Sequence, residues 1–210
     1  ILLMKVFKKL QFIVVASVTM VMVRQVQAEI QFPFSVDNIK SDQALQVQNL
    51  VRAMALLDRS MEVYFSADGK SMHRFYNPDT EVRSEEKASV WMYSASIEAV
   101  NAILHGLKAQ KERGNHNQFD KHFMRYMDLL AQLHENAAYY LGTFNLVSFT
   151  QTRDWTVYAV DRAKAKGAAN VTGVLNVYDD QMWLIRELIE AYHLTGKERY
   201  LKEAEYLTTY

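Results

Sequence analysis

The chain has 210 residues, half of them apolar, a length that suits one or two domains with a substantial core. Its 24 basic and 24 acidic residues cancel, so the composition does not indicate a nucleic-acid partner. The absence of Cys excludes disulfides, thiolate metal sites and a Cys nucleophile. With only 7 Gly and 2 Pro the chain has few helix breakers, which indicates long helices.

The N-terminal segment has the pattern of a secretory signal peptide. Lys5, Lys8 and Lys9 precede an apolar run over residues 10–23, and Val26-Gln27-Ala28 is a small-residue cleavage site. We expect a signal peptide over residues 1–28, cleaved after Ala28, and export to a bacterial periplasm or exterior. No stable membrane span is then expected in the mature protein. The alternative is an uncleaved anchor, but the apolar run is short for a span of about 20 residues.

Five helices are predicted after this segment, from apolar positions that recur at helical spacing. They cover about residues 42–65, 84–113, 119–141, 179–194 and 198–210. Turns are expected at Asp68-Gly69 and Asn77-Pro78-Asp79, while Gly142 is expected to end the third helix and Gly196 the fourth. The stretch from Thr143 to Val160 is rich in Thr, Val and aromatic residues, which predicts a short hairpin or an extended connection.

Long helices joined by loops predict an all-α fold of stacked antiparallel helix hairpins. The predicted helices would leave much apolar surface without a partner, and the last one reaches Tyr210 without a cap. We therefore expect residues 29–210 to be the N-terminal part of a longer single domain.

The run Tyr178-Asp179-Asp180-Gln181-Met182-Trp183 places two adjacent carboxylates at the start of the fourth helix. A retaining glycosidase needs two carboxyl groups about 5–5.5 Å apart, which neighbouring Asp side chains can reach. One carboxyl would hold a raised pKa and act as the general acid, and the other would attack an anomeric carbon. Asp is also a favoured N-cap, and acids in a first turn complement the helix dipole. Spacing alone favours this structural interpretation.

No other group of residues suggests a mechanism. The six His residues include no H-E-x-x-H pair, and we predict no metal site and no cofactor. A Gly-rich phosphate loop and a G-x-S-x-G elbow are both missing from the sequence.

Four aromatic residues are candidates for binding a sugar, because aromatic faces suit the apolar C–H faces of sugar rings. Trp183 follows Asp180 by three positions and can share its face, as a sugar platform or as the packing anchor of the helix start. Tyr178 directly precedes the Asp pair. Trp155 lies in the predicted hairpin, where Arg153-Asp154-Trp155 could form a surface turn or Trp155 could equally line a sugar site with Tyr158. Trp91 lies among apolar neighbours, where core packing is favoured over a sugar-binding role.

These residues together resemble glycoside hydrolase family 76, the endo-α-1,6-mannanases and their fungal relatives that remodel cell walls by transglycosylation. The resemblance rests on a Y-D-D-x-x-W run at 178–183, followed by Leu194-Thr195-Gly196 and Tyr200-Leu201. It is tight over residues 174–207 and loose over residues 42–158.

The resemblance implies an (α/α)6 barrel and retaining hydrolysis of α-1,6-mannan or mannooligosaccharides by a protein that is expected to be a monomer. It implies that Asp179 is the nucleophile and Asp180 the acid/base. A complete barrel has about twelve helices, so the chain would supply only part of the cleft. The rival hypotheses are a non-catalytic helical-repeat or glycan-binding scaffold, and another (α/α)6 sugar enzyme of the unsaturated glucuronyl hydrolase or epimerase type.

Overall fold

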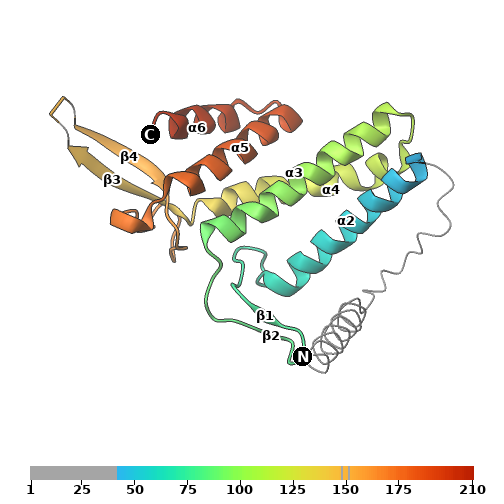
Figure 1. Ribbon diagram of the computed structural model, residues 1–210, viewed down its shortest axis with the longest axis horizontal. Helices are drawn as coiled ribbons and strands as arrows, with labels where there is room; N and C mark the ends of the chain where they lie inside the picture. Colours follow the sequence, from blue (N-terminus) through green and yellow to red (C-terminus); the bar gives the residue numbers. More distant parts are fainter. Residues whose placement is uncertain (1–41, 148, 151) are drawn as a thin grey trace, which may run out of the picture. The chain divides into compact units, whose positions relative to one another are not determined.

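Helices make up most of the described chain, which comprises residues 42–147, 149–150 and 152–210 of the computed structural model (Figure 1). The five α-helices described are α2 (Asp42–Tyr64), α3 (Val90–Glu112), α4 (Asn117–Ala137), α5 (Tyr178–Thr195) and α6 (Glu198–Thr208). The same residues also form two two-stranded antiparallel sheets and a 3-10 turn, η2 (Gly173–Leu175). The mostly helical fold is thus confirmed, and the described residues show no closed barrel. The predicted signal peptide and its cleavage site lie outside them.

Helices α3 and α5 lie side by side and run in the same direction (Figure 1). Three polar pairs establish the direction, because the residue numbers rise together along both helices. The pairs are Glu98–Arg186 at 2.8 Å, Asn101–Glu187 at 2.8 Å and His105–Glu190 at 2.7 Å. Their shared direction places the N-terminal ends of α3 and α5 at the same end of the helix pair.

The other helices pack antiparallel to these two. In α4, the carbonyl of Leu133 accepts a bond of 2.9 Å from the hydroxyl of Tyr93 in the first turn of α3. In α2, the ring of Phe65, which follows the helix, packs 6.0 Å from the same Tyr93 ring. Helix α6 folds back along α5 after Gly196, whose left-handed φ of 66° ends α5 as the sequence predicts. Consecutive helices among the described residues therefore run antiparallel to one another.

Helix α3 begins later than predicted, at Val90 rather than near Ser84. The preceding residues are held in extended structure, because β1 (Tyr76–Asn77) pairs with β2 (Val82–Arg83) and Lys87 bridges to His73. Ser89 then provides the N-cap, with its hydroxyl accepting from the Met92 N–H at 3.5 Å. Competition from these extended contacts explains the shorter helix.

The predicted hairpin is confirmed, with β3 (Leu141–Val147) paired to β4 (Thr152–Tyr158), and it projects from the helices in Figure 1. Gly142 does not end α4 as predicted, because α4 stops at Ala137 and Gly142 lies in β3. A Cβ at this position would lie 2.0 Å from the carbonyl oxygen of Ala169, so glycine is required by close backbone approach.

Apolar side chains from every helix meet in one core, with α3 at its centre. The fully buried residues of α3 include Val90, Ile97, Val100, Leu104 and Leu107, and α5 adds Leu184, Leu188 and Ala191. Among the described residues, none of the helices combines the length and apolar character that crossing a bilayer requires.

Candidate active site

The Asp pair lies in the first turn of α5, at the end where α3 also begins. Val177 is the N-cap, with an extended backbone, and its apolar side chain makes no capping hydrogen bond. The interpretation of either Asp as the N-cap is therefore wrong, whereas their place in the first turn is confirmed. Both carboxylates still lie where the helix dipole favours negative charge.

The two carboxyl groups have different surroundings. Asp179 is exposed, and its Oδ1 accepts a bond of 3.1 Å from the backbone N–H of Asp180. Asp180 is only 7% exposed. Burial raises the pKa of Asp180 above its usual value, and the neighbouring Asp179 charge raises it further. The arrangement favours a proton on the buried Asp180 carboxyl.

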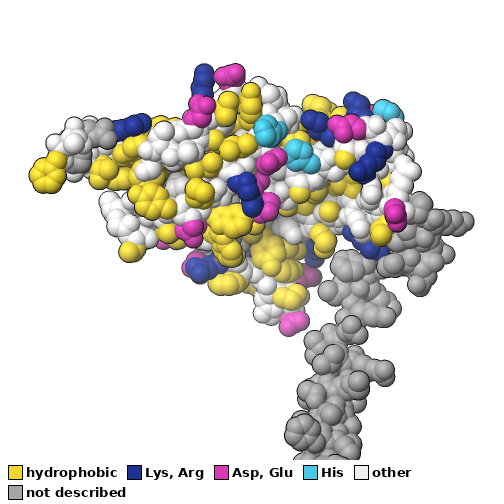
Figure 2. All heavy atoms as spheres, turned by 45° about the horizontal axis from the view of Figure 1, so that its top comes forward, with side chains coloured by type: hydrophobic (Ala, Val, Ile, Leu, Met, Phe, Trp, Pro, Cys, Tyr) yellow, Lys and Arg dark blue, Asp and Glu magenta, His cyan; other side chains and the backbone are white. Residues whose placement is uncertain are grey.

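Trp183 and Trp91 both present ring surface to solvent. Trp183 is 37% exposed, and the guanidinium of Arg186 lies 4.3 Å from its ring centroid. Trp91, in the first turn of α3, is 58% exposed, so the interpretation that it packs in the core is wrong. Figure 2 shows hydrophobic side chains grouped near the middle of one face, with basic and acidic side chains beside them.

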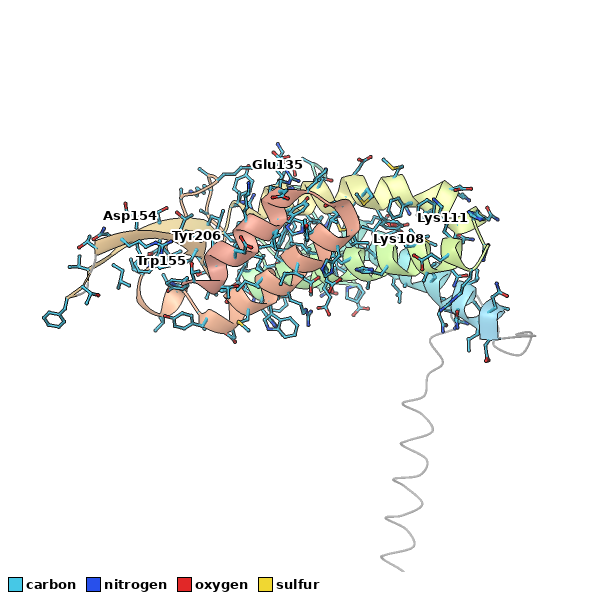
Figure 3. All side chains as sticks on the ribbon, turned by 90° about the horizontal axis from the view of Figure 1, so that it is seen from above. Lys108, Lys111, Glu135, Asp154, Trp155 and Tyr206 are labelled. Atoms are coloured by element: carbon cyan, nitrogen blue, oxygen red, sulfur yellow. The ribbon has the colours of Figure 1, made fainter. Side chains whose placement is uncertain are left out.

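Tyr178 and Trp155 belong to an aromatic cluster at the base of the hairpin. Tyr178 is exposed and stacks on Tyr210 at 5.1 Å between ring centroids. Trp155 is only 5% exposed and packs against Tyr206 and Tyr210, while Arg153 lies 3.9 Å from its ring centroid (Figure 3). Trp155 is therefore a packing residue in this structure, which differs from the sugar-binding role expected from the sequence.

Two charged residues near the Trp side chains were not singled out from the sequence. Arg186 bridges Glu98 of α3 and the buried Glu187 of its own helix, at 2.8 Å in each case. Their spacing in the sequence could have identified them. Arg186 follows Trp183 by three positions, which places both on one face of the helix. Glu98 follows Trp91 by seven positions, with the same consequence. Arg186, bound to both carboxylates, supplies a charged hydrogen-bonding group beside the exposed Trp183 ring.

None of the predicted site residues lines the apolar groove between α2 and α3. This groove has a volume of about 490 Å³, and its walls include Leu50, Leu57, Ala95, Ala99 and Ile103. Within the described residues, no group of three or more His, Asp or Glu side chains could hold a metal ion.

Comparison with known proteins gives no assignment: no family model matches the chain, and neither the curated proteins nor the solved structures yield a match.

Proposed function

We propose that this chain is part of a retaining glycoside hydrolase that cleaves α-1,6-mannosidic linkages, as its resemblance to glycoside hydrolase family 76 implies. The single observation that carries the proposal is the asymmetry of the Asp pair. Asp180 is buried with a raised pKa, while Asp179, beside it, is exposed and accepts a backbone hydrogen bond. Retaining hydrolysis needs one carboxyl that donates a proton and one carboxylate that attacks.

In the proposed reaction Asp180 protonates the glycosidic oxygen while Asp179 attacks the anomeric carbon. The leaving sugar departs with the proton, and the remaining sugar is held as an ester of Asp179. Asp180, now ionised, then takes a proton from water, which attacks the same carbon and releases Asp179. Hydrolysis of this ester, or transfer of the sugar to another hydroxyl, completes the cycle.

Exposed aromatic rings near the starts of α3 and α5 fit a neutral polysaccharide. The exposed rings of Trp183, Trp91 and Tyr178 offer apolar faces for sugar rings, and Arg186 with Glu98 offers donors and acceptors for hydroxyl groups. In the proposed (α/α)6 barrel, α3 and α5 would be inner helices and α2, α4 and α6 outer ones. Further hairpins of a longer polypeptide would complete the cleft, and the signal peptide would export the enzyme.

The test is the activity of Asp179→Asn and Asp180→Asn in the longest available form of the protein. Each substitution removes one carboxyl and keeps the side-chain shape, so α-1,6-mannan turnover should fall by about 100- to 10,000-fold or more. Release of reducing ends and circular dichroism measure activity and folding. Near-normal turnover in either folded variant would contradict the proposal.

The same variants separate catalysis from the rival glycan-binding function, which the exposed Trp91 and Trp183 rings favour. A scaffold without catalytic activity would bind α-1,6-mannooligosaccharides equally well before and after both Asp substitutions, and would release no reducing ends. In that case Trp183→Ala should weaken binding, as a lost aromatic platform requires.

A further inference from the structure

The side chain of Gln181 connects the first turn of α5 to the end of β4. Its Oε1 accepts from the backbone N–H of Tyr158 at 2.9 Å, and its Nε2 donates to the carbonyl of Tyr158 at 2.7 Å. Gln181 is 2% exposed, so these two bonds are shielded from water. One amide side chain thus satisfies both backbone groups of one residue, as a neighbouring strand would.

The open edge of β4 explains why both groups of Tyr158 are free to meet α5. Tyr158 stands opposite Leu141 in the sheet. The neighbouring backbone hydrogen bond that points towards β3 runs from the Ala159 N–H to the Tyr140 carbonyl, at 2.7 Å. The backbone groups of Tyr158 point to the opposite side, where Gln181 lies. Without that side chain, two buried backbone groups would lack partners, which is costly.

A second branch of this contact reaches the residues that precede the Asp pair. The Nε2 of Gln181 lies 3.5 Å from Asn176 Oδ1 and 3.4 Å from the carbonyl of Val177. Asn176 in turn donates to the hydroxyl of Tyr210, whose ring stacks on Tyr178. The Gln181 side chain therefore ties the residues that precede the Asp pair to the end of β4.

We propose that Gln181 is a positioning residue, which fixes the first turn of α5 against β4 and thereby keeps Asp180 buried beside the exposed Asp179. The catalytic part of this proposal rests on the proposed glycosidase function, whereas the effect on Asp180 does not. Asp180 directly precedes Gln181 in the same turn, so we expect a displacement of this turn to change the access of water to its carboxyl. Small displacements of reacting groups cost large factors in rate.

The experiment compares Gln181→Met with Tyr126→Phe in the same chain. Met keeps the length and burial of the side chain but forms neither bond to Tyr158. Tyr126→Phe removes a buried hydroxyl between α4 and α2, where it contacts Asp58 at 3.1 Å, and leaves α5 unchanged. The control therefore loses hydrogen bonds of a largely buried hydroxyl at a place away from the Asp pair.

Titration of the Asp180 carboxyl by carbon NMR is the first measurement. We expect the pKa of Asp180 to fall towards the ordinary Asp value in Gln181→Met and to stay unchanged in Tyr126→Phe. The amide of Tyr158 should also exchange with solvent faster in Gln181→Met alone. An unchanged Asp180 pKa in folded Gln181→Met, or an equal change in both variants, would overturn the proposal.

Kinetics on α-1,6-mannan is the second measurement. In Gln181→Met we expect kcat to fall by about 10- to 100-fold with little change in KM, and the pH profile to shift with the pKa of Asp180. Unaltered kcat would overturn the positioning role. An inactive wild type would instead refute the glycosidase function, and the titration would still decide the role of Gln181. If Gln181→Met does not fold, Gln181→Asn, one methylene shorter, should produce the same changes.

Discussion

The starts of α3 and α5 lie at the same end of the helix pair but are built differently. At α3, Ser89 caps the helix, the first turn contains no acidic residue, and Val90 and Tyr93 are buried in the core. At α5, an exposed Val177 stands at the N-cap and the carboxyl of Asp180 is buried. Both starts attach to the end of the hairpin, since the Val90 N–H donates to the Val160 carbonyl at 2.8 Å and Gln181 binds Tyr158.

The difference indicates that the start of α3 stabilises the folded protein, whereas the start of α5 destabilises it. A buried carboxyl group and an N-cap residue without a capping side chain are both unfavourable for folding. Such destabilising features are typical of functional sites, where a group with a shifted pKa is kept at the expense of stability. The comparison therefore predicts opposite responses when the two helix starts are made alike.

The largest expected effect is a loss of stability in acid that His134 causes. This loss would hide the difference between the two helix starts at low pH. It is half-buried as a residue, but its Nε2 atom is buried and has no hydrogen-bond partner among the described residues, and its ring lies 4.7 Å from that of Tyr200 in α6. Burial lowers the pKa of His134 to about 3, and the charge of Arg199 contributes.

Because the pKa of His134 is lowered in the folded state, its unfolded form binds the proton first as the pH falls below about 6.5. Stability is then lost between about pH 6.5 and pH 3, by about 3 kcal/mol at pH 4. Urea unfolding at several pH values should show this loss in the wild type and a smaller one in His134→Phe. Equal losses in the two proteins would show that His134 is not responsible.

A smaller effect is expected from Asp180→Asn, which removes the buried charge. The raised pKa of Asp180 means that the folded state favours the proton, so the wild type loses stability as the pH rises above about 3.9, the value in an unfolded chain. Asp180→Asn should therefore be more stable than the wild type by about 0.5–2 kcal/mol at neutral pH, with no gain below pH 3.9.

The exposed Asp179 provides the matched control for this substitution. Asp179→Asn should not stabilise the protein, because its carboxylate is solvated and lies where the helix dipole favours it. Thermal unfolding of both variants in the His134→Phe background measures their stability without the pH-dependent contribution of His134. Equal stability of Asp180→Asn and the wild type at pH 7 would remove the contrast between the helix starts.

The smallest effect is expected from exchanging the caps. Ser89→Ala removes the hydroxyl that accepts from Met92 and should destabilise the protein by about 0.5–1 kcal/mol. Val177→Ser supplies the missing cap to α5 and should stabilise it by a similar amount. Changes of the same sign in the two variants, measured by urea unfolding, would contradict the proposed difference.

The sequence predicts the helices well because periodicity is a local signal. The bounds of α2 agree within a residue, and Gly196 ends α5 as expected. The late start of α3 and the strand position of Gly142 depend on extended segments that compete for the backbone, which helical spacing does not reveal.

The sequence and the resemblance suggest the candidate residues and different roles for the two Asp residues, but not the burial that distinguishes them. The Asp pair and its flanking aromatic residues are local in sequence, whereas the bonds that hold the first turn of α5 join segments far apart along the chain. The bond between Gln181 and Tyr158 joins residues 23 positions apart, and Glu98 meets Arg186 from another helix. The burial of Trp155 likewise requires α6 beside the hairpin.

The anomeric configuration of the first product from an α-1,6-mannooligosaccharide tests the central claim most directly. Proton NMR during the first minutes of hydrolysis distinguishes the two anomers before they interconvert. If Asp179 attacks and Asp180 donates the proton, the new reducing end appears first as the α-anomer. The β-anomer appearing first, or no cleavage by the full-length protein, would contradict the account.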